Sequence, residues 1–167
     1  MARRVFFSFH YDNDCRRAAQ VRNSNVIQKD LIESPGFIDA ANWEEVKRQG
    51  DDAIKRWICR QMEGTSVTVV LIGSQTVDNN GSVRPWIKFE IDESLKKGNG
   101  LLGIYIHNCN DPLNGKDSKG ENPFQHLYFG GTKTFLSTKY FTYDWINDNG
   151  RENLGRWIEK AAQDAGK

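Results

Sequence analysis

The sequence predicts an α/β fold in which helices cover both faces of a parallel sheet. Along the chain, short apolar segments alternate with longer amphipathic ones, the pattern of repeated strand–helix units. The most strand-like segment, residues 66–72, is apolar on both faces near its end, as expected for a parallel strand covered from two sides. Five such strands fit a flavodoxin-like three-layer sandwich with the strand order 2-1-3-4-5.

Strands are predicted where aromatic and β-branched residues gather in short runs. These segments are residues 3–10, 37–39, 66–72, 101–106 and 140–143. Helices are predicted where the chain is charged and apolar residues recur at helical spacing. These segments are residues 12–33, 51–62, 83–97 and 154–165, and residues 108–134 form a long polar loop.

Turn and capping residues mark several of these boundaries. Residues 34–36, Ser-Pro-Gly, form a turn before the second strand. Pro85 lies in the first turn of its helix, where its missing N–H costs nothing. Lys96 and Lys97 lie at the end of the same helix that favours cations, and Gly98 follows them.

The composition fits one domain over residues 1–167 and argues against several classes of protein. The chain has 23 Lys and Arg residues against 22 Asp and Glu residues, a net charge of +1. Nucleic-acid binders and polybasic membrane anchors carry a basic excess instead. No apolar run approaches the ~20 residues of a membrane helix, and the first one breaks at Ser8 and His10, unlike a signal peptide. Three widely spaced cysteines suit a reducing compartment, so a cytoplasmic location is expected.

The predicted strand order places a ligand crevice at the carboxyl ends of strands 1 and 3. In this sequence those ends are residues 9–11 and residues 73–76. His10 could bind a nucleotide or cap the strand end, and the sequence favours neither. Trp43, just after the second strand, could stack on a base or fill the core, with the core slightly favoured.

The helix over residues 83–97 carries the strongest candidate for chemistry. Ile87, Ile91 and Leu95 form an apolar stripe that should face the sheet. Trp86 and Glu90 lie one turn apart on the adjacent stripe, near the predicted crevice. A carboxylate beside a large ring could act on an electron-poor sugar. The pattern by itself favours the alternative, in which Glu90 is a solvated charge on an amphipathic helix.

Motifs of other functional classes are absent or incomplete. The sequence has no GxGxxG after a strand and no GxxxxGK[ST], so dinucleotide-fold and P-loop fingerprints are missing. A receiver-type phosphoacceptor needs an Asp at the end of strand 3, where Ile72-Gly73-Ser74 stands instead. His107 and Cys109 form a pair without a second pair at zinc spacing, and no metal site is predicted.

Several blocks of the sequence together resemble TIR-like proteins, and in particular the ThsB family of bacterial Thoeris anti-phage systems. The blocks are residues 5–11, 37–40 with Trp43-Glu44, 65–76, 86–91, 97–99, 103–104, 118–124 and 143–145. Several blocks in the right order are more specific than any single motif. Residues 127–139 resemble nothing in the family.

The resemblance implies a TIR-like fold and cleavage of the nicotinamide–ribose bond of NAD⁺, which is the substrate, so that no cofactor is expected. In ThsB-like members the product is a cyclic ADP-ribose isomer, a second messenger that activates a separate effector. The family's catalytic glutamate lies four residues beyond a tryptophan, which here is Glu90 after Trp86. TIR enzymes generally gain activity by self-association, here in response to an unidentified phage trigger.

The resemblance also suggests roles for the residues of the predicted crevice. An ionised Glu90 would stabilise positive charge on the ribose as nicotinamide departs. Phe9, Trp43 and Trp86 would stack on flat rings, with His10 and Tyr11 nearby, and Ser74 would hold phosphate oxygens. Two competing hypotheses remain: a non-enzymatic TIR adaptor that binds partner proteins, and a small-ligand sensor without turnover.

Overall fold

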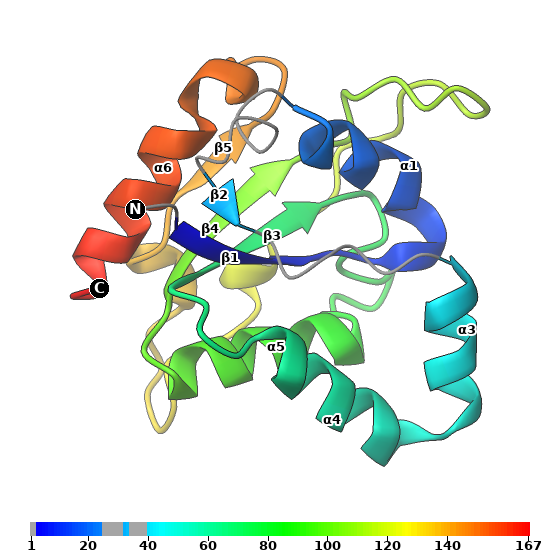
Figure 1. The fold of residues 1–167 in the computed structure, drawn as a ribbon. Coiled ribbons are helices and arrows are strands. Elements are labelled where there is room, and N and C mark those ends of the chain that lie inside the picture. Colours follow the sequence, from blue (N-terminus) through cyan, green and yellow to red (C-terminus); the bar gives the residue numbers. More distant parts are fainter. Residues whose placement is uncertain (1–2, 25–31, 34–39) are drawn as a thin grey trace.

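The computed structural model describes residues 3–24, 32–33 and 40–167. In this part of the chain, helices lie on both faces of a central parallel sheet (Figure 1). The strands are β1 (Arg3–Ser8), β2 (Ile32–Glu33), β3 (Val67–Ile72), β4 (Gly100–Tyr105) and β5 (Thr142–Asp144). The helices are α1 (Tyr11–Arg22), α3 (Ala40–Arg48), α4 (Asp51–Gln61), α5 (Pro85–Lys96) and α6 (Gly150–Asp164). The predicted α/β fold with a parallel sheet is confirmed.

The strands lie in the order β2-β1-β3-β4-β5. Four of them, β1, β3, β4 and β5, form the longer pairings and follow one another in chain order, while β2 adds two residues at the free edge of β1. The second strand predicted over residues 37–39 lies outside the described residues. The edge strand that the structure contains is therefore not the one predicted from the sequence.

Two layers of apolar side chains hold the helices to the sheet. On one face, Ala18 and Val21 of α1 and Leu154 and Ile158 of α6 are buried against the strands. On the other face, α4 and α5 cover the sheet (Figure 1). Every residue of β3 is buried, which explains why its sequence is apolar on both faces.

Helix α6 approaches β4 so closely that a side chain would not fit between them. A Cβ atom on Gly100 would lie 2.3 Å from the carbonyl oxygen of Ala161. A glycine at the start of β4 therefore allows the helix to pack directly on the strand.

Two predicted helices differ from the observed ones. The helix predicted over residues 12–33 does not match α1, which ends at Arg22, or β2, to which residues 32–33 belong, while residues 25–31 lie outside the described part of the chain. The N–H groups of Asn23 and Ser24 bond to the carbonyls of Ala19 and Val21 and close the helix, and Asn and Ser favour such ends over helix interiors. Helix α6 begins at Gly150, four residues before the predicted start at 154.

Helix α3 is not among the helices predicted from the sequence. The predicted polar loop over residues 108–134 contains one short 3-10 turn, Pro123–Gln125. Among the described residues, no helix combines the length and apolar character needed to cross a bilayer.

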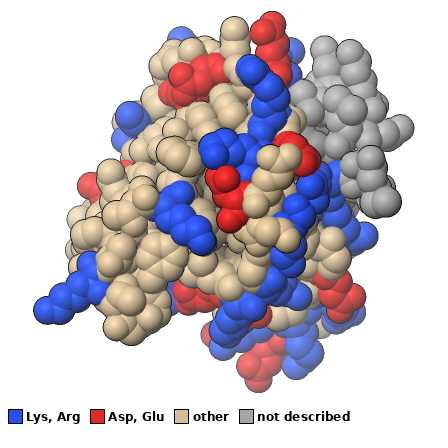
Figure 2. All heavy atoms as spheres, turned by 90° about the vertical axis from the view of Figure 1, so that its left-hand side faces the viewer, with Lys and Arg blue, Asp and Glu red and all other residues tan. Residues whose placement is uncertain are grey.

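Charges of both signs are mixed on the molecular face that includes α6. Figure 2 shows basic and acidic side chains interspersed over this face. The ion pairs Arg3–Glu159 and Lys160–Asp164, with N···O distances of 2.9 and 2.8 Å, contribute to this mixture. The near-equal numbers of acidic and basic residues in the sequence are thus matched by a mixture of both charges on this face.

Candidate active site

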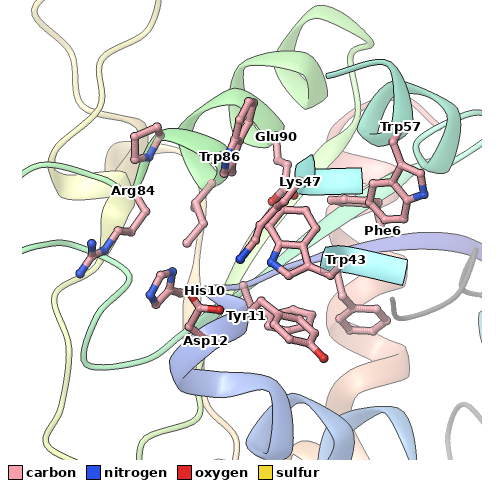
Figure 3. Close-up of a pocket in the computed structure, with 14 residues that line it drawn as sticks. Phe6, His10, Tyr11, Asp12, Trp43, Lys47, Trp57, Arg84, Trp86 and Glu90 are labelled. Carbon is pink, nitrogen blue, oxygen red and sulfur yellow. The ribbon is translucent and has the colours of Figure 1, made fainter. Parts of the chain in front are cut away.

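A cavity of about 310 Å³ lies at the carboxyl end of β1, between that strand, the start of α1 and helices α3, α4 and α5 (Figure 3). Most of its wall is aromatic, with charged groups from three elements. The lining residues are Phe6, Phe7, Phe9, His10, Tyr11, Asp12, Trp43, Lys47, Trp57, Arg84, Pro85, Trp86, Ile87 and Glu90. Aromatic walls with a few polar groups are typical of a site for a small organic ligand.

Glu90 directs its carboxyl group toward the sheet rather than into bulk solvent. Ser8, the last residue of β1, is fully buried, and its hydroxyl donates a hydrogen bond to Oε2 of Glu90. The contact joins residues 82 positions apart in the chain. This placement contradicts the interpretation of Glu90 as a solvated surface charge.

Burial changes the protonation of this carboxyl group. Desolvation raises the pKa of Glu90 to about 8, and the hydrogen bond from Ser8 opposes part of that rise. In the ligand-free protein at neutral pH, the neutral acid therefore predominates. A cation that enters the cavity would favour the ionised form and lower this pKa.

The position of Glu90 is fixed by the way α5 attaches to the sheet. Ile87 and Ile91 are buried against the core, as the predicted apolar stripe required. One turn beyond Glu90, the hydroxyl of Ser94 donates to the Glu90 carbonyl at 2.7 Å and lies 2.6 Å from the hydroxyl of Thr68 in β3. Apolar packing and a buried hydroxyl pair thus hold the helix that carries the carboxyl group.

Aromatic rings at the cavity wall contact one another and their neighbours. The ring centroid of Tyr11 lies 6.2 Å from that of Phe9 and 6.2 Å from that of Trp43. Trp86 makes an edge-to-face contact with Phe89 at 6.2 Å. Trp43 lines the cavity and also packs against a buried cluster, and its role in stacking on a base stays a prediction.

Two cations at the cavity wall were not predicted from the sequence. The guanidinium of Arg84 donates to the carbonyl and side-chain oxygens of Gln75 at 2.8 and 2.9 Å, which fixes its orientation. The ammonium of Lys47 lies 2.9 Å from Glu44 and 5.6 Å from the ring centroid of Trp43. Both cations line the same cavity as Glu90.

His10 stands at the end of β1 and is the N-cap residue of α1, where its side chain makes no capping hydrogen bond. Its ring lines the cavity. Burial, and secondly the charge of Arg84, lower the pKa of His10, so its neutral form is favoured at neutral pH. A neutral imidazole can both donate and accept a hydrogen bond at the cavity wall.

Ser74 is the predicted site residue that the structure does not bring to the cavity. Its hydroxyl donates to Oδ2 of Asp117 at 2.5 Å, and the side-chain amide of Asn13 donates to both residues. The guanidinium of Arg17 lies 3.9 Å from the carboxylates of both Asp117 and Asp14, so the charged groups around Ser74 pair with one another. Ser74 is therefore not among the residues that line this cavity, which lies beside strand β1 rather than between the ends of β1 and β3, and its role in holding phosphate stays a prediction.

The remaining candidates from the sequence lie outside the cavity. Burial raises the pKa of Cys109 to about 11, which keeps its thiol protonated. Within the described part of the chain, no three His, Cys, Asp or Glu side chains are grouped in a way that would hold a metal ion.

Ser8, Lys47 and Arg84 are the site residues that sequence reasoning missed. Ser8 carried a signal, because it is a polar residue inside an otherwise apolar strand segment. Arg84 directly precedes Pro85 at the start of the helix and could have been placed near the crevice. Lys47 had no such signal, since it lies on α3, which was not predicted.

A flavodoxin-like parallel fold with a carboxylate and a tryptophan one helical turn apart over the sheet edge is consistent with a TIR-like domain. Residues 6–111 match the family model for the TIR-like domain of Thoeris protein ThsB. A relative from Bacillus cereus strain MSX-D12, described as a candidate cyclic ADP-D-ribose synthase and named ThsB1, is 33% identical over 196 aligned positions. The alignment covers 95% of this chain and 100% of the relative. The chain therefore belongs to the ThsB family of TIR-like proteins, and the predicted resemblance is confirmed.

Proposed function

We propose that this protein cleaves the bond between nicotinamide and ribose in NAD⁺ and closes the remaining ADP-ribose into a cyclic isomer. The observation that carries the proposal is the Glu90 carboxyl group, held by Ser8 in an aromatic cavity. The name of the Bacillus cereus relative supports the same class of product.

Glu90 has the chemistry that the bond cleavage needs. As nicotinamide leaves, positive charge develops at the anomeric carbon of the ribose. An ionised carboxylate placed there stabilises this charge, and such preorganised groups are worth roughly 10²–10³ in rate. Because the substrate's nicotinamide ring is itself cationic, its binding favours the ionised form of Glu90 over the neutral acid of the empty site.

The other cavity residues can position the substrate. Trp43 and Trp86 offer flat faces for the nicotinamide and adenine rings. Lys47 and Arg84 can neutralise the diphosphate, and the fixed guanidinium of Arg84 suits paired hydrogen bonds to phosphate oxygens. A folded-back substrate held in this way brings its own nucleophile to the anomeric carbon, and aromatic walls that exclude water favour ring closure over hydrolysis.

The biological role that we propose follows from the family. The cyclic product would act as a second messenger in anti-phage defence, would reach a separate effector by diffusion in the cytoplasm, and would be made after self-association in response to a phage trigger. A non-enzymatic adaptor has no use for a buried carboxyl group at the wall of a cavity, so we do not favour that alternative.

The experiment is incubation of the purified protein with NAD⁺, at high protein concentration and in lysates of phage-infected cells. Nicotinamide release is measured by chromatography, and mass spectrometry separates a cyclic product from linear ADP-ribose, which is heavier by one water. We expect Glu90→Gln to reduce nicotinamide release by at least ~10²-fold.

The matched control is Asp92→Asn, which removes an exposed acid on the same helix, paired with Lys88 at 2.7 Å. This control should turn over at the parent rate. A folded Glu90→Gln protein that releases nicotinamide as fast as the parent would overturn the role of Glu90. No nicotinamide release by the parent in either setting would favour the adaptor.

A further inference from the structure

Glu90 has one hydrogen-bond partner for its carboxyl group among the described residues, and that partner is a serine with no access to bulk water. Ser8 is 0% exposed and ends strand β1. It is paired in register with Val70 of β3, so the backbone of Ser8 is held by the middle of the sheet. The backbone position of Ser8 is therefore fixed, and its hydroxyl cannot reach bulk solvent.

The helix that carries Glu90 is fixed independently, at a point one turn further on. Ser94 bonds to the Glu90 carbonyl and to Thr68 of β3 at 2.7 and 2.6 Å. Two neighbouring strands thus hold α5 on the sheet. Strand β3 contacts the Ser94 hydroxyl, and strand β1 contacts the Glu90 carboxyl group. Because β1 and α5 are both fixed, the contact between Ser8 and Glu90 has a set geometry.

We propose that Ser8 is a positioning residue for Glu90. The Ser8 hydroxyl holds the Glu90 carboxyl group at the cavity wall and favours the ionised form that bond cleavage requires. This inference rests on the proposed function. It assigns to β1 a role in the chemistry, beside the helix α5 that carries Glu90.

A hydroxyl is suited to this role because it can both donate and accept. It can accept from the neutral acid, but it donates to an ionised carboxylate, and this charge-assisted hydrogen bond is the stronger of the two. Neither protonation state of Glu90 is then left with an unpaired buried oxygen facing Ser8, an arrangement that would be costly. An alanine at position 8 would remove the donor and favour the neutral acid.

Other charged and titratable groups also line the cavity around Glu90, but they are not among the causes of the shift in its pKa. His10, Tyr11 and Asp12 line the cavity from the start of α1, Lys47 from α3, and Arg84 from the segment before α5. Burial and the Ser8 hydrogen bond are nevertheless the two causes of the shift in the pKa of Glu90. Of these two, only the hydrogen bond can be removed by a substitution that keeps the cavity aromatic.

The test is the pH dependence of kcat/KM for NAD⁺ in the parent, Ser8→Ala and Ser8→Cys proteins. We expect the activity of the parent to rise with pH through a limb set by Glu90 in the free enzyme. Ser8→Ala should move this limb about one pH unit toward alkaline values and lower kcat/KM about tenfold at pH 7, with recovery above the limb. Ser8→Cys, a weak donor, should lie between the two.

Ser66→Ala is the matched control, since it removes a serine hydroxyl that lies 3.5 Å from the carbonyl of Arg4, at the opposite end of β1. It should leave the limb unmoved. A loss of activity in Ser8→Ala that is equal at every pH would overturn the inference, because a structural defect does not recover when the pH is raised.

A second measurement separates this inference from the proposed function. Carbon-13 labelling of the Glu carboxyl groups allows direct NMR titration of Glu90, assigned with Glu90→Gln, without any turnover. An alkaline shift of the Glu90 titration in Ser8→Ala supports the inference even if NAD⁺ is not consumed. Identical Glu90 titrations in the parent, Ser8→Ala and Ser8→Cys proteins overturn it, even if NAD⁺ is consumed.

Discussion

At Glu90, the ionised form that the proposed chemistry needs is also the form that destabilises the folded protein. Its pKa in the folded protein is about 8, against an ordinary value of 4.5. Between these two values the folded chain holds a proton that the unfolded chain has released. Stability therefore falls as the pH rises from about 4.5 to about 8. A buried carboxyl group poised in this way is typical of a functional site.

Glu90→Gln should therefore stabilise the protein while it abolishes turnover. At pH 9 we expect the free energy of unfolding to rise by on the order of 2 kcal/mol, because the amide carries no buried charge. At pH 4 both proteins are neutral at this position, and the difference should nearly vanish. Urea unfolding at the two pH values measures the effect.

Asp92→Asn is again the control, since its carboxyl group is 42% exposed. It should show no such dependence on pH. An equal gain from Glu90→Gln at pH 4 and pH 9 would mean that packing, and not ionisation, is the cause.

At the scale of elements, the attachment of α5 to the sheet depends on a pair of buried hydroxyls. Thr68 and Ser94 are both 0% exposed, and their oxygens lie 2.6 Å apart. Neither hydroxyl can turn to bulk water if its partner is removed. Element packing and site geometry are therefore coupled, because Ser94 lies one turn beyond Glu90 on α5 and donates to its carbonyl oxygen.

Ser94→Ala should lower the free energy of unfolding by about 1–3 kcal/mol, since it leaves the hydroxyl of Thr68 without this partner. Thr68→Val combined with Ser94→Ala should recover much of that loss, because no unpaired hydroxyl then remains. Chemical denaturation of the two single variants and the double variant closes a double-mutant cycle. Additive losses would show that the two hydroxyls do not depend on each other.

At the scale of the whole molecule, the cavity is built from parts of the chain that are far apart in sequence. Its walls come from β1, the start of α1, α3, α4 and α5. A ligand that bridges these elements binds the folded state and not the unfolded chain. Such a ligand raises the global stability by mass action.

NAD⁺ should therefore raise the Tm of the catalytically impaired Glu90→Gln protein. At a concentration near 100 times Kd the gain corresponds to about 2.7 kcal/mol. Adding Arg84→Gln or Lys47→Gln should weaken this gain, since each removes a cavity charge that we propose neutralises the diphosphate, and the remaining gain should depend less on salt. Differential scanning fluorimetry over a range of NAD⁺ and salt concentrations gives the measurement.

Lys88→Gln is the matched control for these two cations, because Lys88 is an exposed cation on α5 that pairs with Asp92. It should leave the NAD⁺-induced shift unchanged. If all three substitutions reduce the shift equally, the binding is a non-specific attraction to positive charge.

Features that depend on neighbouring residues could be predicted from the sequence. The strand-like residues 66–72 became β3, and the spacing of Ile87 and Ile91 placed α5 on the sheet. The same spacing placed Trp86 and Glu90 on one side of that helix, and the family resemblance followed from blocks of local sequence. Periodicity and capping are local properties, so they can be recognised without knowledge of the fold.

The contacts of Glu90, and the predicted residues that join it at the cavity, depend on how distant segments of the chain pack together. Ser8 and Glu90 are 82 positions apart, and no local pattern relates them. Ser74 follows a strand end next to that of β1, yet its hydroxyl turns to Asp117, while Lys47 reaches the cavity from the unpredicted α3. The physical reason is that contacts between distant segments follow from how helices pack on the sheet, and burial, which raises the pKa of Glu90, exists only once that packing is complete.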